Sequence, residues 1–198
     1  MNTTEHPRCS YAAYLLGRLV MKVMGWKVEG GPPRSNKMVI IAAPHTSNWD
    51  LILLLGAAFS LRLSINWLGK DALFRYGAGT IMRFTGGVPI DRSKHNNMVA
   101  HLVEEIARRD GFALVVPPAG TRSYTPTWKS GFYWIAKGAQ IPLVCGFLDY
   151  ERKVAGLGDS FVPSDDLTAD MDRIRKFYAP IVAKYPENKS TIRLREEG

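Results

Sequence analysis

Three near-continuous apolar runs constrain the fold of this chain more than any other feature. Residues 38–43 (MVIIAA), 112–116 (FALVV) and 141–148 (IPLVCGFL) are apolar at almost every position. A strand buried on one face alternates instead, so such runs are typical of strands buried on both faces of a parallel sheet. Segments with helical spacing lie between them. The sequence therefore predicts an α/β fold with a central, largely parallel sheet flanked by helices.

Periodicity and turn residues predict the remaining elements. Helices are predicted over 11–24, from Leu51 onward, and over 74–84, 96–109, 132–137 and 170–184. Shorter strands are predicted over 26–28 and 63–68, and 86–92 should turn into a short extended stretch. After Asp149 the chain becomes polar and no strand is predicted. With 198 residues and no internal repeat, the chain has the length of a single domain.

The first predicted helix, 11–24, is amphipathic. Arg18 and Lys22 lie opposite its apolar arc. The residues of that arc are Leu15, Leu16, Leu19, Val20, Val23 and Met24. Such a helix fits the headgroup layer of a membrane, and it equally fits a helix packed on the domain. We expect residues 1–30 to be an N-terminal amphipathic, membrane-associating segment that precedes a domain over 31–198.

The net charge of +8 indicates an anionic partner, and nucleic acid, acidic lipid headgroups and phosphorylated substrates all fit it. The sequence has no nucleic-acid-binding motif, so we expect no nucleic-acid partner. No stretch reaches the about 18 apolar residues that span a bilayer, and residues 1–10 do not resemble a signal peptide. Two distant cysteines indicate a reducing compartment, and neither they nor the four histidines show metal-ligand spacing.

His45 precedes Asp50 by five positions, directly after a predicted strand, in the segment PHTSNWD at 44–50. An imidazole takes a proton from a hydroxyl near neutral pH when a carboxylate fixes its tautomer. A continuous helix would hold the two side chains about 140° apart, so a turn must separate them. Asp50 would then lie in the first helical turn, where the helix dipole favours its charged form. Alone, the pattern also fits a histidine that caps a helix.

This H-x4-D pattern is the first of four short blocks. GGVPIDR at 86–92, GTRS at 120–123 and IPL at 141–143 follow in order. Together they resemble the four blocks of the glycerolipid acyltransferase family, which includes 1-acylglycerol-3-phosphate acyltransferases. The resemblance runs from about Trp26 to Val144, with looser similarity up to the C-terminal helix. It implies that residues 31–198 form an acyltransferase domain.

The resemblance implies transfer of an acyl chain from acyl-CoA or acyl-carrier protein to the hydroxyl of a lysophospholipid or related lipid. His45 would be the general base and Asp50 would orient it, as in a Ser-His-Asp system in which the substrate replaces serine. The thioester is a co-substrate, and no cofactor or covalent acyl-enzyme is implied. Because the donor is cytoplasmic, the resemblance implies peripheral attachment to the cytoplasmic face of a membrane through the N-terminal helix.

The other blocks supply the implied substrate-binding residues. Arg92 and Arg122 are permanently charged forks suited to a phosphate, and the amides of Gly120 and Thr121 suit the same anion. Lys70, near the end of a predicted strand, is a third candidate cation. Taken singly, each of these cations also fits a solvated surface residue.

Ala119 departs from the family's third block, which usually reads Pro-Glu-Gly-Thr-Arg-Ser. The family associates that glutamate with acceptor binding and activity. Three explanations remain open: an inactivating substitution, a naturally impaired relative, or compensation by another carboxylate such as Asp91. The alternative function is therefore a catalytically silent relative that binds acyl lipids. Ala119 and Ser123 complete the predicted site, although Ser123 also fits a turn residue bonded to its own backbone.

Overall fold

The computed structural model describes residues 6–70, 74, 79–90 and 98–197, and it leaves the side chains of Lys70, Phe84, Pro89 and Ile90 undescribed. The strands are β1 (Lys27–Gly30), β2 (Lys37–Ala42), β3 (Asn66–Lys70), β4 (Gly87–Ile90), β5 (Phe112–Val116), β6 (Leu143–Asp149) and β7 (Val154–Phe161). The α-helices are α1 (Tyr11–Val23), α2 (Trp49–Ser60), α3 (Gly79–Phe84), α4 (Met98–Arg108), α5 (Gly131–Ala139) and α6 (Leu167–Tyr178).

These strands form one sheet in the order β1-β7-β6-β2-β5-β3-β4. Every neighbouring pair is parallel except β6 and β7, which pair antiparallel. The strand β2 lies in the middle, between β6 and β5. The prediction of an α/β fold with a central, largely parallel sheet is confirmed.

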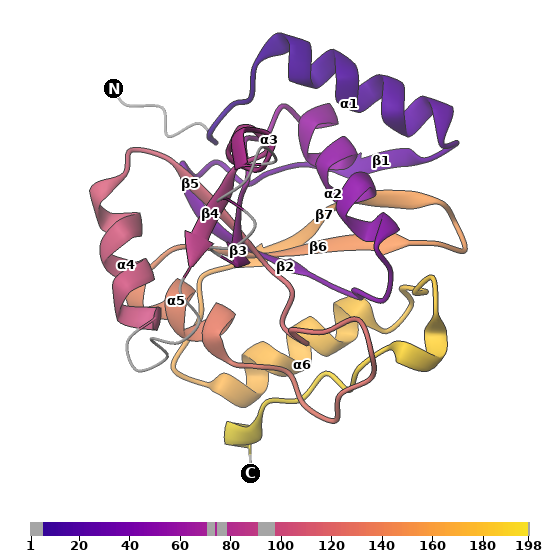
Figure 1. Cartoon of the computed structure of the whole chain (residues 1–198). Helices are drawn as coiled ribbons and strands as arrows, with labels where there is room; N and C mark the ends of the chain where they lie inside the picture. The colour runs from indigo at the N-terminus through magenta and orange to yellow at the C-terminus, as the bar shows by residue number, and fades with distance from the viewer. Residues whose placement is uncertain (1–5, 71–73, 75–78, 91–97, 198) are drawn as a thin grey trace.

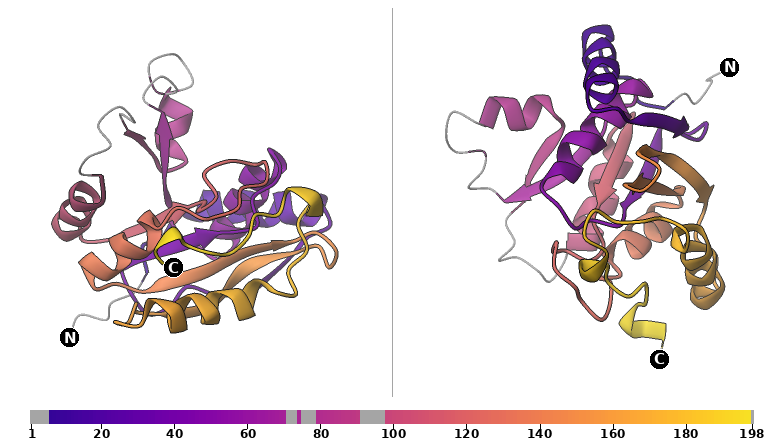
Figure 2. Two further views of the ribbon diagram at one scale, coloured as in Figure 1. Left: turned by 90° about the horizontal axis from the view of Figure 1, so that it is seen from below. Right: turned by 90° about the vertical axis from the view of Figure 1, so that its right-hand side faces the viewer.

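Helices cover both faces of this sheet, as Figures 1 and 2 show. Val39 and Ile41 of β2 pack into the core shared with α4, α5 and α6. Met38 and Ile40 point to the other face, toward α2. Successive side chains of a strand alternate between faces, so a strand covered on both sides needs apolar residues at every position. The three apolar runs of the sequence have this origin.

Several predicted boundaries are wrong. The polar stretch after Asp149 contains β7, which the sequence did not predict because only its first four residues are buried. The last helix spans Leu167–Tyr178 rather than 170–184, and Asp166 caps it by accepting from the amide of Ala169 at 2.9 Å. Gly138 lies inside α5 instead of ending it. Of the helix predicted over 74–84, the described residues show α3 from Gly79.

The helix α1 packs on α2 through small residues and through Met21. Its buried positions include Ala13 and Gly17, and a Cβ at Gly17 would lie 2.8 Å from the carbonyl oxygen of Gly56. Four large apolar side chains of α1 nevertheless face outward: Leu15, Leu16, Leu19 and Val23 are 51–77% exposed. Within the described ranges, no helix has both the length and the apolar character to cross a bilayer.

Candidate active site

Two loops of the predicted site leave neighbouring strands at the same edge of the sheet. Ile41 near the end of β2 pairs with Val116, the last residue of β5. The loop 43–48 therefore starts beside the loop 117–123. In open α/β sheets, ligands bind outside the carboxyl ends of such strands.

The turn between β2 and α2 closes around the carboxylate of Asp50. His45 Nδ1 lies 3.0 Å from Asp50 Oδ2. The backbone amides of Thr46 and Ser47 donate to the same oxygen at 2.8 and 2.9 Å. Asp50 lies in the first turn of α2, as the spacing predicts. The carboxylate thus fixes the loop and the imidazole together.

The other oxygen of Asp50 is held by a residue 100 positions away. Tyr150, directly after β6, donates its hydroxyl to Oδ1 at 2.5 Å. Burial tends to raise the pKa of Asp50, but the hydrogen bonds from His45, Tyr150 and the Ser47 amide outweigh it and lower that pKa. Burial and the hydrogen bond to Asp50 raise the pKa of Tyr150 far above its ordinary value. The site therefore contains a carboxylate and a protonated phenol.

With Nδ1 engaged by the carboxylate, Nε2 is the ring nitrogen of His45 that remains for chemistry. A neutral imidazole that donates Nδ1–H to Asp50 carries its lone pair on Nε2. The side chain of His45 is 27% exposed, whereas that of Asp50 is only 5% exposed. The imidazole is therefore far more accessible to a substrate than the carboxylate.

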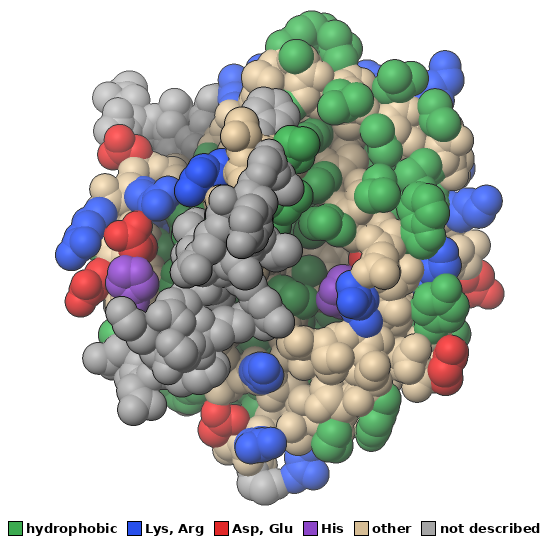
Figure 3. Space-filling model, in the orientation of Figure 1, with side chains coloured by type: hydrophobic (Ala, Val, Ile, Leu, Met, Phe, Trp, Pro, Cys, Tyr) green, Lys and Arg blue, Asp and Glu red, His purple; other side chains and the backbone are tan. Residues whose placement is uncertain are grey.

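A cavity of about 480 Å³ lies between α2 and the sheet, with His45 in its wall. Most of its lining is apolar and includes Leu51, Leu54, Ala57, Leu61, Leu63 and Trp67. Asn48, Arg122 and Lys129 are the main polar side chains beside His45 and Asp50 in this lining. Figure 3 shows the surface hollowed next to α2, beside hydrophobic side chains that gather over α1 and α2. The imidazole of His45 and the cationic side chains of Arg122 and Lys129 therefore border one largely apolar cavity.

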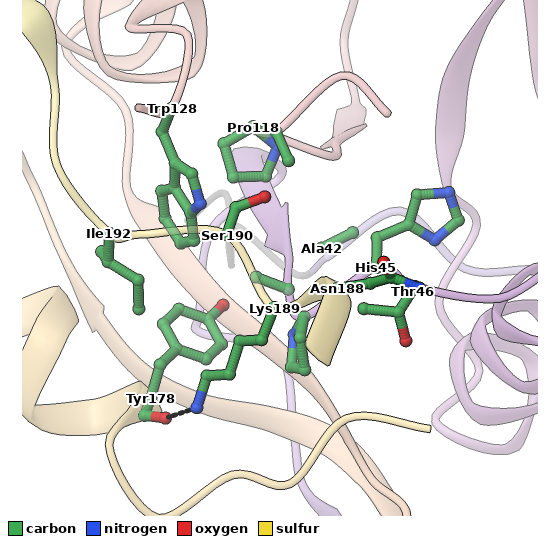
Figure 4. Close-up of a pocket in the computed structure, with 13 residues that line it drawn as sticks. Ala42, His45, Thr46, Pro118, Trp128, Tyr178, Asn188, Lys189, Ser190 and Ile192 are labelled. Carbon is green, nitrogen blue, oxygen red and sulfur yellow. Dashed lines mark hydrogen bonds between the residues drawn. The ribbon is translucent and has the colours of Figure 1, made fainter. Parts of the chain in front are cut away.

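Ala119 faces a second, much smaller hollow on the other side of the His45 loop. Its volume is about 20 Å³, the space of one water molecule, and its far wall is the C-terminal segment 188–192. Figure 4 shows Lys189 extending across this region to the carbonyl of Tyr178, to which it donates at 3.1 Å. Burial lowers the pKa of Lys189. Ala119 thus lies close to His45, but outside the large cavity.

Only some of the predicted substrate-binding residues lie close together in the part of the chain that the structure describes. Gly120 and Arg122 line the large cavity with His45. Gly120 has φ +68°, a backbone conformation that favours glycine, and Lys129 Nζ would lie only 2.9 Å from a Cβ at this position. Thr121 and Ser123 are exposed and do not line the cavity, and the Ser123 amide donates to Thr121 Oγ1 at 3.3 Å.

The structure does not describe the side chains of the remaining predicted residues. Arg92 and Asp91 lie outside the described residues. Lys70 is the last residue of β3, and its side chain is not described. Their predicted roles in substrate binding stay predictions.

Sequence reasoning missed Tyr150 and Lys129, and it considered Asn48 only as a turn or N-cap residue. Tyr150 follows a buried strand, as the other site segments do, and that position was its one available signal. Lys129 has no local pattern around it. Asn48 accepts a hydrogen bond from Arg122 instead of capping α2 with its side chain.

The acyltransferase family model matches residues 26–146. No curated protein matches the chain. Among solved structures, the chain is similar to the 1-acyl-sn-glycerophosphate (LPA) acyltransferase PlsC from Thermotoga maritima, with a TM-score of 0.57 and 18% sequence identity. That likeness covers 85% of this chain and 74% of the other, and at this identity it concerns the fold. Because the family model spans more than half of its length, the chain belongs to the acyltransferase family.

Proposed function

We propose that this protein is a lipid O-acyltransferase that uses His45 as its general base. The acyl chain would come from acyl-CoA or acyl-carrier protein, and the acceptor would be the hydroxyl of a lysophospholipid or related glycerolipid. The observation that carries the proposal is the His45–Asp50 pair in the wall of an apolar cavity of about 480 Å³.

The pair supports a direct transfer. His45 Nε2 removes the proton from the acceptor hydroxyl, and the oxygen attacks the thioester carbonyl carbon to form a new C–O bond. The tetrahedral intermediate collapses, the C–S bond breaks, and the thiolate leaves with the proton from the imidazolium. Asp50 stays charged and stabilises the imidazolium in between. The thioester is consumed as a co-substrate and no metal or cofactor takes part.

The two sides of the site suit the two parts of the substrates. The apolar lining under α2 suits a hydrocarbon chain, because apolar surface removed from water contributes about 25 cal/mol per Å². Arg122 and Lys129 suit the phosphate of the acceptor, since charge-assisted hydrogen bonds to phosphate are the strong ones. Arg92, Lys70 and the amides of Gly120 and Thr121 remain further proposed contacts to that anion.

We propose attachment to the cytoplasmic face of a membrane through α1. An ordinary surface helix buries its large apolar residues against the domain. Here α1 packs through Ala13, Gly17 and Met21 and exposes its leucines. Trp49, Leu51 and Ile52 of α2 add 40–50% exposed apolar side chains. Arg18 and Lys22 on α1 suit anionic headgroups.

A catalytically silent relative that binds acyl lipids is the second candidate, and Ala119 is the observation in its favour. The family's glutamate at this position carries a charge that alanine cannot replace. Such a protein would bind lysophospholipid in the same cavity without turnover.

The experiment is acyl transfer from acyl-CoA and from acyl-carrier protein to a panel of lysophospholipids on vesicles, with products detected by mass. The chain and its Ala119→Glu variant are assayed together. Transfer by either form supports the enzyme, and the panel identifies the acceptor. Transfer by the glutamate form alone assigns the loss of activity to Ala119. Absence of product from both forms, with saturable lysophospholipid binding, would establish the silent relative.

A further inference from the structure

We propose that Tyr150 is a positioning residue for the His45–Asp50 pair. Its hydroxyl holds one oxygen of the Asp50 carboxylate and thereby keeps the other turned toward the imidazole. This inference rests on the proposed function of the pair, and it adds a residue from a distant part of the chain to that site.

The hydrogen bonds of Asp50 divide unequally between its two oxygens. Oδ2 meets His45 Nδ1 and the amides of Thr46 and Ser47. Among the described residues, Oδ1 has a hydrogen bond from Tyr150 alone, at 2.5 Å. Asp50 is 4% exposed, so water does not replace a lost partner freely. A buried carboxylate oxygen without a partner would favour rotation of the carboxylate or its protonation, and both weaken its hold on His45.

Tyr150 is itself fixed on several sides. Its amide donates to the carbonyl of Val182 at 2.9 Å. Its ring meets Trp26 edge to face, with 4.9 Å between ring centroids. The ammonium of Lys184 lies 5.8 Å from the centre of the same ring. The phenol is therefore held in place before any substrate binds, which is the property a positioning residue needs.

The geometry favours positioning over proton relay. Apart from Asp50, the titratable or charged groups that face Tyr150 are Lys184 and Tyr185, and His45 faces Asp50 from the other side. The pKa of Tyr150 lies far above its ordinary value because the phenol is buried and donates to a carboxylate. Tyr150 consequently keeps its proton throughout, and the proton that moves in the reaction stays on His45 Nε2 and the substrates.

The first test compares Tyr150→Phe with Tyr133→Phe. Tyr133 is a matched control, because its buried hydroxyl also donates to a buried aspartate, Asp170, at 3.0 Å, in a different part of the fold. The acyl-transfer assay is run on the active form of the protein, either the chain with Ala119 or its Ala119→Glu variant. In that form, Tyr150→Phe should lower kcat about tenfold with little change in KM. The acidic limb of its pH profile should shift, because the contact between Asp50 and His45 affects how readily the imidazole takes a proton. Tyr133→Phe should leave both the profile and kcat unchanged.

The second test needs no turnover. Carbon NMR of the aspartate carboxyl groups follows the titration of Asp50 in the parent protein and in Tyr150→Phe. The loss of the donor should raise the pKa of Asp50, whereas Tyr133→Phe should leave it alone. Trp26→Phe shortens the ring that packs against Tyr150, and it should raise the pKa of Asp50 by a smaller amount. This variant replaces Tyr150→Phe if Tyr150→Phe does not fold.

The outcomes separate this inference from the proposed function. If no form transfers acyl chains yet Tyr150→Phe raises the pKa of Asp50, the positioning contact stands and the proposed activity fails. If transfer occurs and Tyr150→Phe changes neither the pH profile nor the pKa of Asp50, the inference about Tyr150 is overturned and the activity stands.

Discussion

The guanidinium of Arg122 donates a hydrogen bond to the side-chain oxygen of Asn48, 74 residues earlier in the chain. Asn48 precedes α2 and Arg122 follows β5, so this contact joins the loops that leave two neighbouring strands. His45 lies three residues before Asn48 in the same loop. The contact thus holds a permanent positive charge close to the proposed base, where an anionic acceptor would meet both.

Arg122→Met should weaken acceptor binding more than it slows the chemical step. If Arg122 binds the acceptor phosphate, its removal should raise KM for a phosphorylated acceptor by about 10-fold or more. Neutral acceptors should show no such change. The measurement is the KM for lysophosphatidic acid and for a monoacylglycerol on vesicles. Arg109→Met is the control, because Arg109 is an exposed cation directly after α4 that pairs with Glu105. Equal changes in KM for both acceptors would contradict the phosphate contact.

His45→Ala should slow transfer severely while leaving the fold and lipid binding intact. General-base catalysis contributes about 10²–10⁴-fold, so the rate should fall by that factor. The imidazole is 27% exposed and belongs to none of the hydrophobic clusters of the described residues, so thermal unfolding should change little. Rates and unfolding are measured on the same preparation. Transfer that survives in His45→Ala would require a different base.

Asp50→Asn should destabilise the protein in a pH-dependent way. The folded state lowers the pKa of Asp50, so its charged form stabilises the fold above the unfolded pKa of about 3.9. This stabilisation is lost as the pH falls through the lowered folded pKa. Asp50→Asn should therefore cost about 1–3 kcal/mol of unfolding free energy at neutral pH, and the difference should shrink in acid. Urea unfolding of both proteins across a pH series measures it. A difference that does not vary with pH would mean that packing causes the loss.

Local sequence patterns predicted the layers of the fold and the His45–Asp50 pair of the site. The apolar runs identified β2, β5 and most of β6, because burial on both faces leaves a signature in consecutive residues. The spacing of His45 and Asp50 required a turn, and the turn is present. These features depend on residues that are close together in the sequence.

What the sequence did not reveal depends on contacts between distant segments. Nothing near Tyr150 indicates that its hydroxyl meets Asp50, and nothing near Asn48 points to Arg122. The strand β7 was missed because half of it lies at the surface and lacks an apolar run. The outward direction of the α1 leucines was equally hidden, since an amphipathic pattern does not say which face a partner helix takes. The division of the chain at residue 30 stays a prediction, and β1, which lies before it, pairs with β7.

Leu15→Ser combined with Leu19→Ser should weaken binding to anionic vesicles without unfolding the protein. The two side chains are 51% and 58% exposed on α1, so roughly half of each remains to enter a lipid surface. That portion contributes about 1 kcal/mol per leucine, and the double variant should bind about 30-fold more weakly. Vesicle cosedimentation measures the affinity, and circular dichroism checks the fold. Val162→Ser is the matched control, because Val162 is 53% exposed but lies just beyond β7, outside α1 and α2. If both proteins lose affinity equally, or neither does, α1 is not the membrane-binding surface.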